Sequence, residues 1–170
     1  MSRYIITGNL SSPQNVASIT AWLREYAPVL KDVDPGMALT VAGRSPAATI
    51  LEAASAVGAR VVPSPEDMSA LLKEADIYIC PSDNGSGIKL RMMDGLKQGL
   101  PVVAHVLASR GYEMFVGKSV FLYDSGDTFR KAVADAMGMH CDREELIGLY
   151  RECFSFEAGV KRLRDIVEGL

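Results

Sequence analysis

The sequence predicts an α/β protein, a Rossmann-like three-layer sandwich built on a parallel sheet of about six strands. Short apolar runs of strand length alternate with longer stretches whose apolar residues recur at helical spacing. Glycine, proline and serine close most of the short runs. Such alternation forms βαβ units, whose crossovers are right-handed. The length of 170 residues fits one domain, residues 1–170.

The elements follow one another in a regular order. Six strands are expected at residues 4–7, 39–42, 60–62, 77–80, 101–104 and 119–123. Ser12 and Pro13 form the cap and first position of a helical unit that Pro28 and the DVDPG cluster, residues 32–36, close. Ser45-Pro46 starts a second helix that stops at Gly58. Further helices are expected around Met68–Leu72, from the glycine loop to Gly99, and at residues 129–137, 143–153 and 156–170.

Composition excludes several classes of protein. The net charge is −3 and there is no long run of Lys or Arg, so nucleic acid is not expected as a partner. No stretch has the apolar length of a membrane span or the pattern of a signal peptide. The three cysteines lack metal-ligand spacing and cannot all pair, which favours a reducing cytoplasm. No metal site is expected.

The segment DNGSGIKLRMMD, residues 83–94, carries the first functional signal. Its glycines permit close approach of a ligand, and a helix starting near Gly87 would point free N–H groups at an anion. Lys89 and Arg91 would then lie in the first turn, where cations oppose the helix dipole unless an anion is bound. A bound diphosphate would explain why Lys89 and Arg91 occur at this position. The GK[ST] ending of a P-loop and the dinucleotide fingerprint after the first strand are both absent.

A simpler interpretation remains open for the same segment. Arg91 and Asp94 are three residues apart and would pair on an exposed helix face without any ligand, for a gain of roughly 0.2–0.5 kcal/mol. Parallel sheets bind ligands beyond the carboxyl ends of their strands, where strand order reverses. That rule selects the loops at residues 8–12, 43–45, 63–66 and 82–88.

The run NGSGIKLRMMDGLKQGLPVV resembles the donor-binding signature of group 1 (family 4) glycosyltransferases of the GT-B fold. ITGNLSSPQNVASITAWL, LTVAGRSP and VVPSPEDMSALLKEADIYICPS are similar to the earlier units of that family's C-terminal domain, and the resemblance extends over nearly the whole chain. It implies a glycosyltransferase domain that binds a nucleoside-diphosphate sugar without a further cofactor and transfers the sugar to an acceptor, with retention of configuration. The family's acceptor-binding N-terminal domain is missing and is implied as a partner; through it the enzyme would be cytoplasmic or peripheral to a membrane.

The resemblance also implies roles for individual residues. Asp94 matches the acid that holds the ribose hydroxyls, and Gly87, Ile88, Lys89 and Arg91 match the groups around the diphosphate. The implied donor-binding set is Gly8, Arg44, Ser64, Asn84, Gly85, Ser86, Gly87, Ile88, Lys89, Arg91 and Asp94, with Pro63, Pro65 and Met68 matched less closely along the base. No catalytic residue is assigned.

Three departures from the family pattern keep other functions open. Asp94 stands where Glu is usual, Gly95 where Ala is common, and Ser86 or Asn84 where many members carry a Glu that touches the sugar. A non-catalytic Rossmann-like module, or half of another nucleotide-sugar enzyme such as an epimerase, would show the same departures. Pairing of Arg91 with Asp94 would favour the non-catalytic module.

Overall fold

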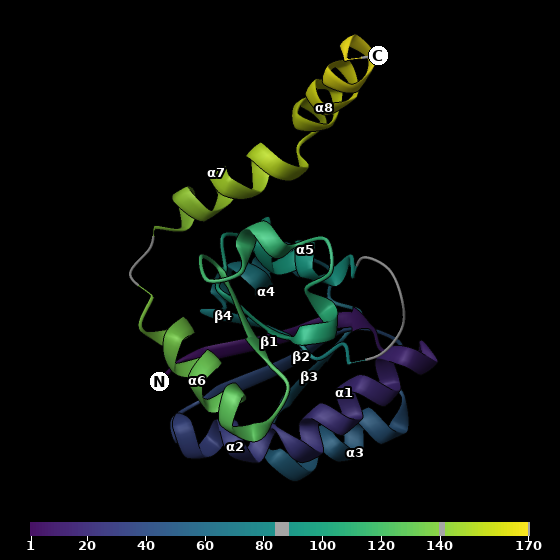
Figure 1. Cartoon of the computed structure of the whole chain (residues 1–170). Coiled ribbons are helices and arrows are strands. Elements are labelled where there is room, and N and C mark those ends of the chain that lie inside the picture. The colour runs from purple at the N-terminus through teal and green to yellow at the C-terminus, as the bar shows by residue number, and fades with distance from the viewer. Residues whose placement is uncertain (84–88, 140–141, 170) are drawn as a thin grey trace.

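The computed structural model describes residues 1–83, 89–139 and 142–169. Strands and helices alternate along most of this length (Figure 1). The elements are β1 (Arg3–Asn9), α1 (Pro13–Glu25), α2 (Ala27–Val33), β2 (Ala38–Arg44), α3 (Ala48–Val57), β3 (Arg60–Pro63), α4 (Met68–Glu74), β4 (Ile77–Cys80), α5 (Arg91–Leu96), β5 (Val102–His105), two 3-10 turns η1 (Val106–Ala108) and η2 (Glu113–Phe115), β6 (Val120–Tyr123), α6 (Gly126–Met137), α7 (Arg143–Phe154) and α8 (Phe156–Glu168).

The described strands form one six-stranded sheet in the order β3-β2-β1-β4-β5-β6. Every neighbouring pair in it is parallel. The chain builds outward from β1 to β3, then returns to place β4 on the other side of β1. The order therefore reverses between β1 and β4, which is the place where open parallel sheets bind ligands. The predicted fold class is confirmed.

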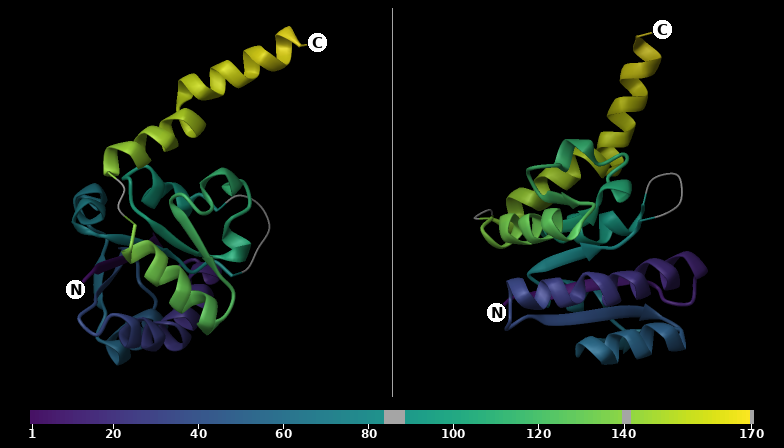
Figure 2. Two further views of the ribbon diagram at one scale, coloured as in Figure 1. Left: turned by 60° about the vertical axis from the view of Figure 1, so that its left-hand side comes forward. Right: turned by 60° about the horizontal axis from the view of Figure 1, so that its bottom comes forward.

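Two apolar cores cover the two faces of the sheet (Figures 1 and 2). Successive strand residues point to opposite faces, so Tyr4 and Ile6 of β1 join one core while Ile5 joins the other. The first core is covered by α1, α2, α3 and α6. Within it, the rings of Trp22 and Phe129 pack edge to face with their centroids 5.8 Å apart. The second is covered by α4, α5 and α7. This is the predicted three-layer sandwich.

The last helix lies outside both cores. α8 extends away from the sheet (Figure 2), and none of its described residues is buried. Its apolar side chains are exposed to solvent: Phe156, Val160, Leu163, Ile166 and Val167. The helix itself was predicted at residues 156–170.

The predicted helix boundaries differ from the structure for local reasons. The first helical unit consists of two helices, because α1 ends at Glu25 and Pro28 lies in the first turn of α2, where a missing N–H is harmless. The unit ends at Val33, within the predicted closing cluster. Ser45 has a φ of 52°, which no helix permits, so α3 starts at Ala48. The predicted stop at Gly58 is confirmed, with a left-handed φ of 73°.

The helix expected from the glycine loop differs most from its prediction. Residues 84–88 lie outside the described residues, and α5 begins at Arg91. Lys89 precedes the helix, so its placement in the first helical turn is wrong. Asp94 lies within the first turn and supplies the acid that this end of a helix favours. The anion site predicted at a helix start near Gly87 lies outside the described residues.

Candidate donor-binding site

A cavity of about 430 Å³ opens at the carboxyl ends of β1, β2 and β3, beside the reversal of strand order. Its lining comes from the ends of β1 and β2, from the loop after β3, from the first residue of α4 and from α5. The lining residues are Thr7, Gly8, Asn9, Gly43, Arg44, Ser64, Pro65, Met68 and Asp94. The structure therefore brings together four predicted donor-site residues, Gly8, Arg44, Ser64 and Asp94, and two that were matched less closely.

The floor of the cavity is backbone rather than side chain. Gly8 and Gly43 are opposite each other in the β1–β2 pair. A Cβ on Gly43 would lie 1.8 Å from the carbonyl oxygen of Gly8, so only glycine fits there. A ligand can consequently approach the two strand ends closely. Ser64, which follows β3, has a left-handed φ of 45°, and its N–H donates to the Gly43 carbonyl at 2.8 Å. Strained backbone of this kind concentrates at functional sites.

Asp94 presents its carboxylate to the cavity from α5. Thr7 Oγ1 donates to Oδ2 at 3.2 Å, and Lys97 Nζ donates to Oδ1 at 3.2 Å. A carboxylate has about four acceptor positions, so each oxygen keeps capacity for another donor. About a third of the side chain, 33%, stays exposed. A sugar with two neighbouring hydroxyl groups matches this arrangement.

Arg91 lies against Gly8 at the end of β1. Its Nη2 donates to Oδ1 of Asn15, while the Asn15 amide donates to the carbonyl of Asn9 at 2.8 Å. The side chain lies over the strand end, because a Cβ on Gly8 would meet Arg91 Cδ at 3.4 Å. Within the described residues, Nη1 is buried and has no hydrogen-bond partner. A buried guanidinium N–H without a partner is costly unless an anion or carbonyl completes it.

The structure separates Arg91 from Asp94. Among the ion pairs of the described residues, Asp94 pairs with Lys97, and Arg91 bonds instead to Asn15. The ligand-free interpretation, in which the two residues neutralise each other, is therefore wrong.

Some predicted site residues cannot be placed at the cavity. Asn84, Gly85, Ser86, Gly87 and Ile88 lie outside the described residues. The carbonyl of Lys89 accepts a hydrogen bond from the hydroxyl of Tyr112 at 2.9 Å, which ties the start of this segment to the loop before η2.

Sequence reasoning missed two residues of this region: Thr7 lines the cavity, and Asn15 holds Arg91. Asn9 and Gly43 also line the cavity and lie in the loops that the strand-order rule selected, although they were not assigned to the donor-binding set. Thr7 carried a usable signal, since it is a polar residue in an otherwise apolar strand and is only 1% exposed. The contact between Asn15 and Arg91 spans 76 positions, and nothing in the local sequence indicates it.

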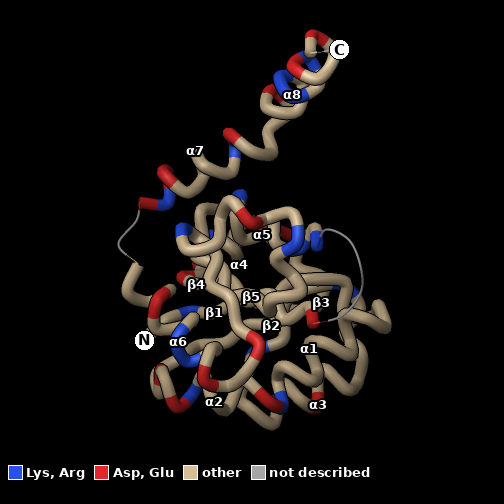
Figure 3. Tube along the Cα trace, viewed as in Figure 1, with Lys and Arg blue, Asp and Glu red and all other residues tan. Residues whose placement is uncertain are grey.

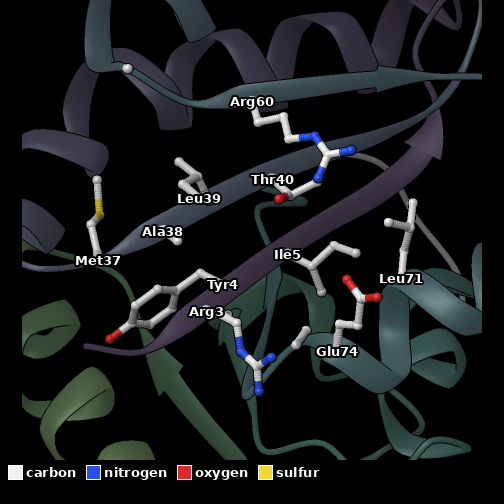
Figure 4. A pocket seen from close by; sticks show the side chains of 12 residues that line it. Arg3, Tyr4, Ile5, Met37, Ala38, Leu39, Thr40, Arg60, Leu71 and Glu74 are labelled. Carbon is white, nitrogen blue, oxygen red and sulfur yellow. The ribbon is translucent and has the colours of Figure 1, made fainter.

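Two other hollows have different chemistry. One of about 390 Å³ lies at the opposite, amino end of the sheet; Figure 4 shows Arg3, Arg60 and Glu74 around Ile5 and Leu71. Arg3 is already bound there, through Nε and Nη2, to Asp76. The other hollow, of about 180 Å³, includes His105, Glu25 and Asp83. His105 Nδ1 accepts from the N–H of Leu107 at 3.3 Å, as a loop histidine does.

The charges of the described residues do not form a basic stripe. Figure 3 shows Lys and Arg interspersed with Asp and Glu along the helices. No three His, Cys, Asp or Glu side chains in the described part of the chain gather as metal ligands. Of the helices within those ranges, none has both the length and the apolar character that a bilayer crossing requires.

A Rossmann-like sheet with a ligand-sized cavity at its reversal point has the layout in which open parallel sheets bind small ligands. Residues 2–141 match the family described as "Glycosyl transferases group 1". The chain belongs to that family of glycosyltransferases, and its sheet is the Rossmann-like domain of the GT-B fold. The predicted family is thereby confirmed.

Individual relatives agree with this assignment. The chain is 25% identical over 137 residues to an "Uncharacterized 44.6 kDa protein in cps region" of Klebsiella pneumoniae; the match covers 76% of this chain and 35% of that protein. The chain thus spans about a third of that curated relative's length.

Solved structures share the fold at low identity. WaaG, a glycosyltransferase involved in lipopolysaccharide biosynthesis, superposes with a TM-score of 0.63 at 15% identity, over 99% of this chain and 48% of WaaG. The catalytic domain of cholesterol-α-glucosyltransferase from Helicobacter pylori superposes with a TM-score of 0.60 at 15% identity, over 89% of this chain and 95% of that domain. A UDP-forming trehalose-phosphate synthase from Burkholderia xenovorans superposes with a TM-score of 0.61 at 12% identity, over 86% of this chain and 38% of the synthase.

Proposed function

We propose that this chain, residues 1–170, is the domain of a glycosyltransferase that binds a nucleoside-diphosphate sugar. The observation that carries the proposal is the arrangement of Asp94 and Arg91. Both residues lie at the end of β1: Asp94 contacts Thr7 and lines the cavity, and Arg91 lies against Gly8, which also lines it. Each is held by other partners, and neither neutralises the other. An acid at the cavity and a guanidinium beside the same strand end suit a ligand with a hydroxylated and an anionic part.

The proposed arrangement assigns one part of the donor to each group. Asp94 accepts hydrogen bonds from the ribose hydroxyls through its remaining acceptor positions. Arg91 and Lys89 offset the negative charge of the diphosphate, with Arg44 at the cavity rim as a further cation. Ser64, with Pro65 and Met68, lies along the base. The cavity volume of about 430 Å³ falls in the range of small-molecule sites.

In the proposed reaction the sugar leaves the diphosphate and joins an acceptor hydroxyl with retention of configuration. Negative charge grows on the departing diphosphate, and cations fixed beforehand stabilise that charge most in the transition state. Arg91 meets this requirement, since Asn15 holds it before any ligand arrives. No residue is assigned as the base.

We also propose a partner domain for the acceptor. The matched relatives support it, because this chain covers 35% of the curated protein and 48% of WaaG. A cytoplasmic location fits the free thiols of Cys80 and Cys153, because that compartment keeps thiols reduced.

Calorimetric titration with UDP, GDP and ADP tests the donor site. We expect saturable binding of one nucleotide, weakened about 10- to 100-fold by Arg91→Ala and by Asp94→Ala, since hydrogen bonds to charged groups contribute about 1.5–3 kcal/mol. Arg130→Ala is the matched control, because Arg130 on α6 pairs with Asp32 at 3.2 Å, away from the cavity. Absence of binding to all three nucleotides would favour the non-catalytic module. Nucleotide binding that neither cavity variant weakens would place the site elsewhere.

A further inference from the structure

A buried chain of hydroxyl groups lies behind Asp94. The Tyr78 hydroxyl on β4 lies 2.8 Å from Thr7 Oγ1 on β1, and Thr7 in turn lies 3.2 Å from Asp94 Oδ2. Tyr78 and Thr7 are 0% and 1% exposed. The chain of contacts therefore leads from the interior of the sheet to the carboxylate at the cavity.

The chemistry of these groups fixes the direction of the hydrogen bonds. A carboxylate only accepts, and a threonine hydroxyl has one proton. The proton of Thr7 is donated to Asp94, so Thr7 must accept the proton of Tyr78. Burial raises the pKa of Tyr78 well above its usual value, and its hydroxyl therefore remains a donor at every working pH. Hydrogen bonds that run in one direction strengthen one another.

Gly95 allows α5 to approach this chain. A Cβ at Gly95 would lie 2.7 Å from Cγ and 2.8 Å from Cβ of Tyr78, so no other residue fits without movement. Asp94, the residue before Gly95, is one methylene shorter than Glu. Close packing of the helix on Tyr78 brings the shorter acid within reach of Thr7. The two departures from the family pattern, Asp94 and Gly95, are thus parts of one arrangement.

We propose that Thr7 and Tyr78 are positioning residues that fix the carboxylate of Asp94 for binding a ribose. Thr7 holds one oxygen directly and Tyr78 orients Thr7. The inference rests on the proposed function for its ligand, whereas the contact itself is a property of the free protein. Each part has its own measurement.

The first measurement concerns the free protein. Thr7→Val keeps the shape of the side chain and removes the hydroxyl, whereas Thr7→Ser keeps the hydroxyl. The ¹³C chemical shift of the Asp94 carboxyl carbon should move in Thr7→Val and stay near its original value in Thr7→Ser. Thr20→Val is the matched control, because Thr20 is a buried threonine of α1 whose hydroxyl has no partner within the described residues. An unchanged shift in Thr7→Val overturns the proposal, whether or not any nucleotide binds.

The second measurement compares a nucleoside diphosphate with its 2′-deoxy form. We expect the original protein to prefer the ribonucleotide about tenfold, and this preference to fall to near onefold in Thr7→Val. Tyr78→Phe should reduce the preference less, since Thr7 still contacts Asp94. Thr7→Ser and Thr20→Val should keep the full preference for the ribonucleotide. A merely structural role would weaken both nucleotides equally, and that result would refute the positioning role. If no nucleotide binds the original protein, the proposed function fails, and with it the ribose part of the inference.

Discussion

Replacement of Gly95 by alanine tests the close packing of α5 on β4. In an open helix interior, alanine is favoured over glycine by about 1 kcal/mol. Here the new Cβ would lie 2.7 Å from Tyr78 Cγ, 2.8 Å from Tyr78 Cβ and 3.0 Å from Val102 Cγ2. Ordinary carbon contacts are about 3.5–4.0 Å, so the helix and the strand must separate by about 1 Å.

The expected net effect is a loss of stability. Overpacking of this kind costs about 1–3 kcal/mol. Because Tyr78 Cβ belongs to the backbone-fixed part of a central strand, we expect the overpacking cost to be about 3 kcal/mol. The helix propensity of alanine offsets about 1 kcal/mol of it, so the net loss of unfolding free energy is about 2 kcal/mol. For a domain of this size that lowers the melting temperature by about 4–8 °C. Thermal unfolding, monitored by circular dichroism, measures this change in melting temperature.

Gly148 of α7 supplies the matched control. It lies in a helix interior, and a Cβ added there would meet no heavy atom of the described residues within 4 Å apart from its neighbours in the helix. Gly148→Ala should raise the melting temperature by about 2–4 °C, through helix propensity alone. Opposite signs for the two variants are the expected result. Equal stabilisation by both would refute the close contact between α5 and Tyr78.

Three further predictions concern other parts of the fold. The hydrogen bonds from Arg3 hold the pKa of Asp76 below its usual value of 3.8, so this pair stabilises the protein above about that pH and the contribution is lost as pH falls through the lowered pKa. In urea unfolding, Asp76→Asn should accordingly be less stable than the original protein at pH 7 and nearly as stable as it at pH 2. Ser125→Ala removes the capping box with Thr128 at the start of α6 and should cost about 1 kcal/mol in urea unfolding; a change below about 0.3 kcal/mol would contradict that cap. Deletion of residues 156–170 should leave the melting temperature nearly unchanged, because the described residues of α8 bury no side chain; a fall of several degrees would show that α8 packs on the domain.

Much of the fold could be predicted from periodicity and turn residues. All six strands lie within about two residues of their predicted positions, because buried parallel strands are near-continuous apolar runs. The start of α5 could not be predicted in this way. Lys89 and Arg91 belong to one continuous stretch of sequence, and only the structure places Lys89 before the helix.

The location of the cavity was predictable from the sequence, whereas the contacts that hold its charged residues were not. The rule for parallel sheets selects the loops after β1, β2 and β3, and Gly8, Arg44 and Ser64 do line one cavity. The groups that hold the charged residues come from distant segments. Thr7 and Asp94 are 87 positions apart, and Tyr78 and Thr7 are 71 apart. No pattern within a window of sequence contains such pairs.

The reversal of strand order between β1 and β4 has a consequence for how the protein folds. The β1–β4 pair joins Tyr4 to Ile77, and it closes a far longer loop than the pairs of β1 with β2 or of β2 with β3. Contacts that close long loops are slow to form. We therefore expect the cavity to be assembled among the last steps of folding. Pulse-labelled hydrogen exchange should protect the β2 amides before those of β4, and nucleotide binding would appear only once β4 is protected.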